Sequence, residues 1–116
     1  MHELSIAYDL YATARKAAIE NNAKYVKRVS VEVGKMAMVN PEQVTFLFGT
    51  IKEDDPLFEK TVLVCTDVTP QTICTCGYYG EEIYVCPGCG ALPKMVKGRE
   101  IVVTNIEIEV EDQNES

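Results

Sequence analysis

The chain has 116 residues, of which 47% are hydrophobic and 25% charged, so it can build one modest core with a small appendage. Its formal net charge of −7 leaves no basic face, which counts against nucleic acid as a partner. No apolar run is long enough for a membrane span, and no signal-peptide pattern follows Met1. We therefore expect a cytoplasmic protein with no membrane partner, in a compartment that keeps thiols reduced.

In the first third of the chain, the spacing of apolar residues predicts a helix followed by a strand. Apolar residues recur at the three- and four-residue spacing of a helix: Leu4, Ala7, Tyr8, Tyr11, Ala14 and Ala18. We expect Asn21-Asn22 to end this helix. Three valines then alternate with polar residues: Val29, Val31 and Val33. This alternation is the period of a half-buried strand, which Gly34 ends or kinks.

A second helix is predicted to begin at Asn40-Pro41. The asparagine side chain can accept hydrogen bonds from the first free N–H groups, and proline fits the first turn. Apolar residues follow at positions i, i+3, i+4 and i+7: Val44, Leu47, Phe48 and Ile51. Asp54-Asp55-Pro56 then breaks the helix.

Two further strands are predicted in the second half of the chain. One covers residues 61–68 and is closed by Pro70, and the other opens at Gly98. Late in the last strand, apolar residues alternate with glutamate: Ile106, Ile108 and Val110. Two earlier apolar residues have the opposite parity: Ile101 and Val103. We therefore expect a bulge or a twist near Thr104-Asn105.

These elements predict the α+β class, with two helices on a three-stranded sheet and a four-cysteine zinc ribbon inserted between the second and third strands. We expect residues 1–70 and 98–116 to form the α+β domain. Residues 71–97 are expected to form the inserted zinc-ribbon domain, which is too small to stand without its metal.

The insert carries two closely spaced pairs of cysteines: Cys74 and Cys76, then Cys86 and Cys89. Zinc takes four thiolates at tetrahedral corners. Two pairs, each followed by a glycine that allows a tight turn, can supply these ligands from two facing loops. The pattern predicts structural zinc, although one residue separates the first pair where two are usual.

Three alternatives to zinc exist for these cysteines. Disulfides are disfavoured in a reducing compartment. A thioredoxin-like redox pair has the spacing of Cys86 and Cys89, but a second pair lies nearby and no long helical pattern follows. An iron–sulfur cluster is left open, because it can use the same number of thiols.

His2 is the only histidine of the chain and follows Met1 directly. The α-amine, the His2 amide nitrogen and the imidazole can lie in one plane, an arrangement that nickel(II) and copper(II) favour. The first N–H groups of a helix have no carbonyl partner within the helix, so losing the amide proton of His2 or Glu3 breaks no helical hydrogen bond. The residues alone also allow a frayed, inert terminal histidine.

Several motifs occur together in one order: Met1-His2-Glu3-Leu4-Ser5, a first helix, a Val-rich strand ending at Gly34, a helix start near Asn40-Pro41, two cysteine pairs, and a closing strand from Gly98-Arg99-Glu100 to Ile106-Glu107-Ile108-Glu109. In this combination the chain resembles the HypA/HybF family of hydrogenase-maturation nickel metallochaperones. The resemblance extends from Met1 to about Glu111. The first cysteine pair departs from it, because the family normally has two intervening residues.

The resemblance implies two metals. Nickel would bind the Met1 amine, the His2 side chain and the backbone of His2 and Glu3, which makes the α+β domain the nickel-binding domain. Structural zinc would be held by the four ribbon cysteines: Cys74, Cys76, Cys86 and Cys89. The implied role is a non-enzymatic carrier, a monomer or weak homodimer, that works with a HypB-type GTPase and delivers nickel to the large-subunit precursor of [NiFe]-hydrogenase.

A second hypothesis is a zinc-ribbon protein-interaction module that transports no metal. Such a module would dock through the ribbon and its tyrosines: Tyr78, Tyr79 and Tyr84. Catalysis is not expected, because the sequence has no second histidine, no Ser/His/Asp set and no glycine-rich phosphate loop, and zinc with four thiolates has no open position.

Overall fold

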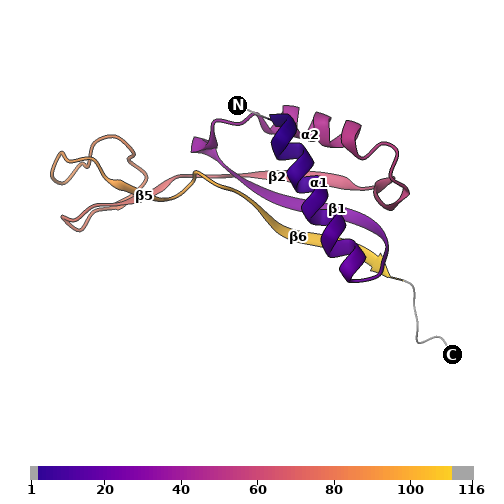
Figure 1. Ribbon diagram of the computed structural model, residues 1–116. Helices are drawn as coiled ribbons and strands as arrows, with labels where there is room; N and C mark the ends of the chain where they lie inside the picture. The colour runs from indigo at the N-terminus through magenta and orange to yellow at the C-terminus, as the bar shows by residue number, and fades with distance from the viewer. Residues whose placement is uncertain (1–2, 111–116) are drawn as a thin grey trace.

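The computed structural model describes residues 3–110 and shows two α-helices lying on one side of a three-stranded sheet, with a smaller sheet at one end of the molecule (Figure 1). The elements follow one another as α1 (Glu3–Glu20), β1 (Ala23–Gly34), η1 (Lys35–Ala37), α2 (Pro41–Ile51), η2 (Pro56–Phe58), β2 (Val62–Val68), β3 (Gln71–Ile73), β4 (Tyr79–Gly80), β5 (Lys94–Lys97) and β6 (Ile101–Val110). The predicted fold class is confirmed. Neither α-helix within the described range is long and apolar enough to cross a membrane.

Strand β1 is the centre of the larger sheet, whose order is β2-β1-β6. It pairs with β2 in parallel, with Val29 opposite Leu63. It pairs with β6 in the antiparallel sense, with Val29 opposite Ile106. A parallel pair needs a crossover between its strands, and α2 lies within that crossover.

The core lies between the sheet and the two helices. Alanines of α1 are fully buried, and their small side chains let the helix backbone approach the core closely: Ala7, Ala14 and Ala18. Phe48 of α2 and Phe58 of η2 meet edge to face, with ring centroids 6.2 Å apart, and Tyr11 packs on Phe58 at 5.0 Å. Valines of β1 complete the core: Val26, Val29, Val31 and Val33.

Strand β6 contains the predicted bulge. Asn105 lies opposite Ser30 and Val103 lies opposite Val31, so Thr104 is an extra residue between them. Because of this insertion, the apolar residues on both sides of Thr104 pack against the core in spite of their opposite parity: Ile101, Val103, Ile106 and Ile108.

The N-terminus of α2 is capped as the sequence predicts. The Oδ1 atom of Asn40 accepts hydrogen bonds from the backbone N–H groups of Glu42, at 2.9 Å, and Gln43, at 3.3 Å. The backbone N–H of Asn40 in turn donates to the Oε2 atom of Glu3, at 3.3 Å. The first described residue of α1 is therefore tied to the start of α2.

The smaller sheet has the order β4-β3-β5 and lies between β2 and β6 in the sequence. The run between the two cysteine pairs contributes only β4, and residues 81–93 have no strand. Strand β5 is absent from the sequence prediction, and β6 begins three residues after Gly98. The division into domains at residues 70 and 98 stays a prediction.

Glycines allow three segments to cross closely where the ribbon meets the larger sheet. A Cβ atom on Gly34 would overlap the carbonyl oxygen of Gly98, and one on Gly98, whose φ is 109°, would overlap the Cα atom of Pro70. The backbone N–H of Met36 donates to the Gly98 carbonyl at 2.9 Å, and that of Gly34 donates to the Glu100 carbonyl at 2.9 Å. This junction fixes where the ribbon leaves the sheet.

Replacing Gly34 by alanine should lower the free energy of unfolding by about 1–3 kcal/mol, because the added methyl group has no space. Gly49 of α2 is the matched control, since a Cβ there meets nothing within 4 Å. Gly49→Ala should raise the stability by up to about 1 kcal/mol. Urea denaturation followed by circular dichroism measures both, and equal effects of the two variants would contradict the crowded junction.

Candidate metal centre

The four ribbon cysteines come together in space. One Sγ atom from each of Cys74, Cys76, Cys86 and Cys89 lies within 4.8 Å of all the others. Two contacts cross between the two loops, 3.5 Å from the Cys74 sulfur to the Cys89 sulfur and 3.5 Å from the Cys76 sulfur to the Cys86 sulfur. Four thiolates around a tetrahedral zinc ion are about 3.8 Å apart, so the cluster has nearly the size that zinc requires.

The first cysteine loop is a tight turn between β3 and β4. The backbone N–H of Gly77 donates to the Cys74 carbonyl at 2.9 Å, and the N–H of Cys74 donates to the Tyr78 carbonyl at 3.0 Å. Gly77 has a φ of 102°, a value that glycine adopts without strain. This turn directs both Cys74 and Cys76 toward the second loop in spite of their short spacing.

The second loop is closed by its own backbone. The N–H of Gly90 donates to the Cys86 carbonyl at 2.8 Å, and the N–H of Cys86 donates to the Ala91 carbonyl at 2.8 Å. The N–H of Gly88 points at the Cys86 sulfur, at 3.3 Å. A Cβ on Gly88 would lie only 3.3 Å from the Cys76 sulfur, so a residue without a side chain keeps the loops together.

Thr72 of β3 supports this centre, although no sequence signal identified it. Its side chain is fully buried, and its Oγ1 atom lies 2.7 Å from the Glu82 carbonyl oxygen and 3.2 Å from that of Gly80. The hydroxyl thus donates to the irregular segment that leads to Cys86. Its role depends on a contact ten residues away, which no local pattern shows.

Within the cluster, the pKa values of two thiols are shifted in opposite directions. Burial opposes ionisation of Cys86, but N–H groups of Cys89 and Gly88, with the thiols of Cys76 and Cys74, outweigh burial and lower the pKa of Cys86 to about 7. The N–H of Tyr78 favours the Cys76 thiolate, but the neighbouring sulfurs outweigh it and raise the pKa of Cys76 to about 12. A second thiolate beside the first therefore needs a cation.

The donor set fits a soft divalent metal ion. Four sulfurs from two loops close the coordination sphere of a tetrahedral ion and leave no position for a substrate. Cys65, the fifth cysteine, lies outside the cluster. It is half-buried in β2 with its sulfur 3.8 Å from the Thr45 hydroxyl, and it packs against the core as expected of a small apolar residue.

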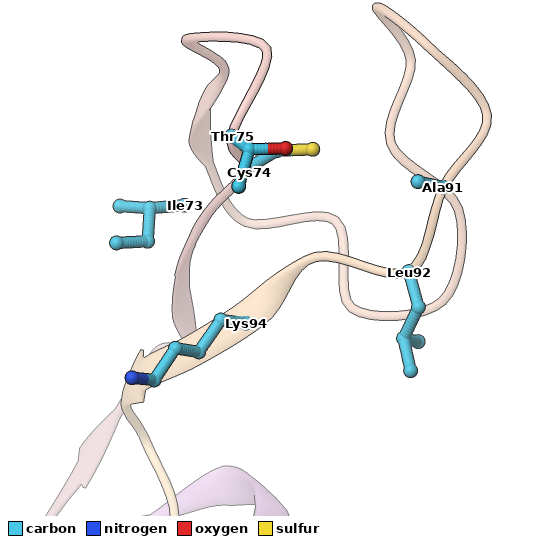
Figure 2. Close-up of a pocket in the computed structure, with 6 residues that line it drawn as sticks. All are labelled: Ile73, Cys74, Thr75, Ala91, Leu92 and Lys94. Carbon is cyan, nitrogen blue, oxygen red and sulfur yellow. The ribbon is translucent and has the colours of Figure 1, made fainter.

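A cleft of about 210 Å³ lies beside the cluster. Figure 2 shows the six residues that line it: Ile73, Cys74, Thr75, Ala91, Leu92 and Lys94. Leu92 is 76% exposed, so its apolar side chain is open to solvent beside the cluster. The wall of the cleft is thus partly apolar, with one ammonium group on Lys94.

The predicted nickel ligands are only partly described. Met1 and His2 lie outside residues 3–110, and Glu3 is the first residue of α1. Its side chain accepts the hydrogen bond from Asn40 described above. The nickel site therefore stays a prediction, with its third residue placed beside the start of α2.

Comparisons with a family model and with individual proteins all match this chain to HypA proteins. A family model described as "HypA: Hydrogenase/urease nickel incorporation, metallochaperone, hypA" matches residues 1–108. A Hydrogenase maturation factor HypA from Methanocella arvoryzae is 40% identical over 95% of this chain and 100% of its own length. One from Methanothermobacter thermautotrophicus is 38% identical over 97% of this chain and 100% of its own length.

Solved structures share the fold. The solution structure of the Ni metallochaperone HypA from Helicobacter pylori superposes with a TM-score of 0.74 at 23% identity, over 96% of this chain and 100% of that one. A second structure, "Solution structure of HypA protein", gives a TM-score of 0.76 over 96% of this chain and 98% of that one.

Proposed function

Because the chain belongs to the HypA family of nickel-incorporation metallochaperones, we propose that it binds nickel(II) at its N-terminus and delivers it during the maturation of [NiFe]-hydrogenase. The observation that carries the proposal is the match of the family model from residue 1 to residue 108, which includes Met1-His2-Glu3. The family description also names urease, but the relatives described above are named hydrogenase maturation factors.

The proposed nickel ligands are the Met1 amine, the His2 side chain and the backbone of His2 and Glu3. Nitrogen ligands suit nickel(II) in a tetragonal geometry. The hydrogen bond from Asn40 to the Glu3 side chain supports this proposal, because it holds the chain that leads to the ligands against a rigid helix start. A site with few protein ligands also suits hand-over, since a ligand of the acceptor can enter before the old ligands leave.

The proposed resident metal is zinc, bound by four thiolates: Cys74, Cys76, Cys86 and Cys89. The size of the sulfur cluster supports it. Zinc would hold the two loops together and would have no open position, which also argues for a carrier over an enzyme. Outside the cluster and Thr72, the ribbon buries little, so we propose that its fold depends on this ion.

We propose a HypB-type GTPase and the large-subunit precursor of [NiFe]-hydrogenase as partners, in the cytoplasm. The names of the relatives support a role in hydrogenase maturation. The exposed apolar side chains of the ribbon support a protein contact there: Tyr79, Tyr84, Val85 and Leu92.

Replacing His2 by alanine should abolish nickel binding and leave one zinc ion per chain, because the imidazole and its preceding amide complete the nickel site. The measurement is a nickel titration of untagged, zinc-loaded protein, followed by absorbance and metal analysis. Asp9→Ala is the matched control, since it removes an exposed carboxylate from the same helix, and it should bind nickel as the unmodified chain does.

A tag placed ahead of Met1 removes the α-amine and provides an independent test. It should weaken nickel binding as strongly as His2→Ala. If nickel binds equally well to all variants, the nickel site lies elsewhere. If no variant binds nickel, the protein is better described as a zinc-ribbon interaction module.

A further inference from the structure

The stretch of residues 81–85, which connects β4 to Cys86, has neither helix nor strand. Its side chains are half-buried or exposed, and those of Tyr84 and Val85 are 71% and 57% exposed. Cys86 at its end is nevertheless buried, with its sulfur 3.5 Å from that of Cys76. The course of this stretch is therefore set by contacts with side chains outside it.

The hydroxyl of Thr72 makes the first of these contacts. Thr72 is fully buried on β3, two residues before Cys74. Its Oγ1 atom lies 2.7 Å from the carbonyl oxygen of Glu82 and 3.2 Å from that of Gly80. A hydroxyl has one proton, so the shorter contact, to Glu82, is the stronger hydrogen bond. The strand that leads to the first cysteine pair is thus tied to the backbone that precedes the second pair.

The hydroxyl of Tyr78 makes the matching contact on the other side of Glu82. It accepts a hydrogen bond from the Glu82 backbone N–H at 3.3 Å. The phenol end of Tyr78 lies against Gly80, where an added Cβ atom would overlap it. Tyr78 also belongs to the first cysteine turn, because its carbonyl accepts from the Cys74 N–H at 3.0 Å. The N–H and the carbonyl of Glu82 are therefore both held by side chains that flank the first cysteine pair.

We propose that Thr72 and Tyr78 are positioning residues of the zinc site, which hold Glu82 from both sides and so increase the affinity of the ribbon for zinc. They act on the ligands proposed above, on which this role rests, and are not ligands themselves. Zinc needs sulfurs from both loops at one point, and for such a module the free energy of metal binding is also free energy of folding. A hydrogen bond that holds the two loops in the metal-bound arrangement therefore tightens zinc binding.

The larger sheet provides a matched comparison for Thr72. Within residues 3–110, the buried polar residues are Thr61 and Thr72. The Thr61 hydroxyl donates to the Val26 carbonyl at 2.7 Å, the same distance as from Thr72 to Glu82. It ties the residue before β2 to β1, within the larger sheet. The loss of a buried hydroxyl can thus be compared at two positions, of which only one serves the ribbon.

Competition for zinc between the full chain and a chromophoric chelator tests the proposal. Thr72→Val keeps the shape of the side chain but removes the donor to the Glu82 carbonyl, and should raise the dissociation constant of zinc about tenfold. Tyr78→Phe removes a longer bond at an exposed N–H, which water can replace, and should raise the constant only about threefold. Thr72→Ser keeps the hydroxyl and should bind zinc nearly as tightly as the unmodified chain.

Two control variants lack a hydroxyl that does not reach Glu82. Thr61→Val should destabilise the larger sheet and leave the affinity for zinc unchanged. Tyr79→Phe removes a hydroxyl that donates to the Oε1 atom of Gln71 at 3.0 Å, and should also leave the affinity unchanged. The absorption of bound cobalt(II) should be the same in every variant, because all four sulfur ligands are kept.

The outcomes separate this proposal from the zinc site itself. Equal affinities of Thr72→Val and Thr61→Val would overturn the positioning role and leave the zinc site standing. So would a Thr72→Ser variant as weak as Thr72→Val, since the loss would then come from packing and not from the hydroxyl. A change of the cobalt absorption in Thr72→Val would also overturn it, because the variant would then have lost a ligand. An unmodified chain that binds no zinc would overturn both.

Discussion

The backbone ladders on the two sides of β1 are the constraint on which the structure depends. This strand is paired along both edges, and its buried valines pack in one core with the two helices. Because one of its partners follows the ribbon in sequence, the chain must leave the sheet after β2 and return to it at β6. The chain enters the ribbon at Pro70 and leaves it at Gly98, and both residues lie in the crowded crossing with Gly34.

The larger sheet and the ribbon are stabilised in different ways. The larger sheet relies on apolar burial, with two phenylalanines and four alanine or leucine positions of α1 in its core. The ribbon has little to bury besides Thr72, Pro93 and Cys86. At its centre, the neighbouring sulfurs raise the pKa of Cys76 to about 12 and so oppose its ionisation. A small module of this kind needs a cation to hold its loops together, which is how a structural metal substitutes for a core.

Local patterns in the sequence predicted much of this architecture. The cap at Asn40, the helical period of α1 and the bulge at Thr104 each depend on residues within a few positions of one another. The cysteine pairs likewise indicated the cluster, because their chemistry limits the alternatives. Strand β5, the contact of Thr72 and the Gly34–Gly98 crossing were not predicted, since they depend on residues that only the folded chain brings together.

The place of β6 at the end of the sheet has a consequence for synthesis. Chains emerge from the ribosome N-terminus first. The helices, β1 and β2 therefore leave the ribosome before β6, the strand that closes the other edge of β1. If the proposed zinc ion clamps the two loops of the ribbon, it would shorten the flexible path across which β6 must find β1. The availability of that metal would then influence how quickly the larger domain matures.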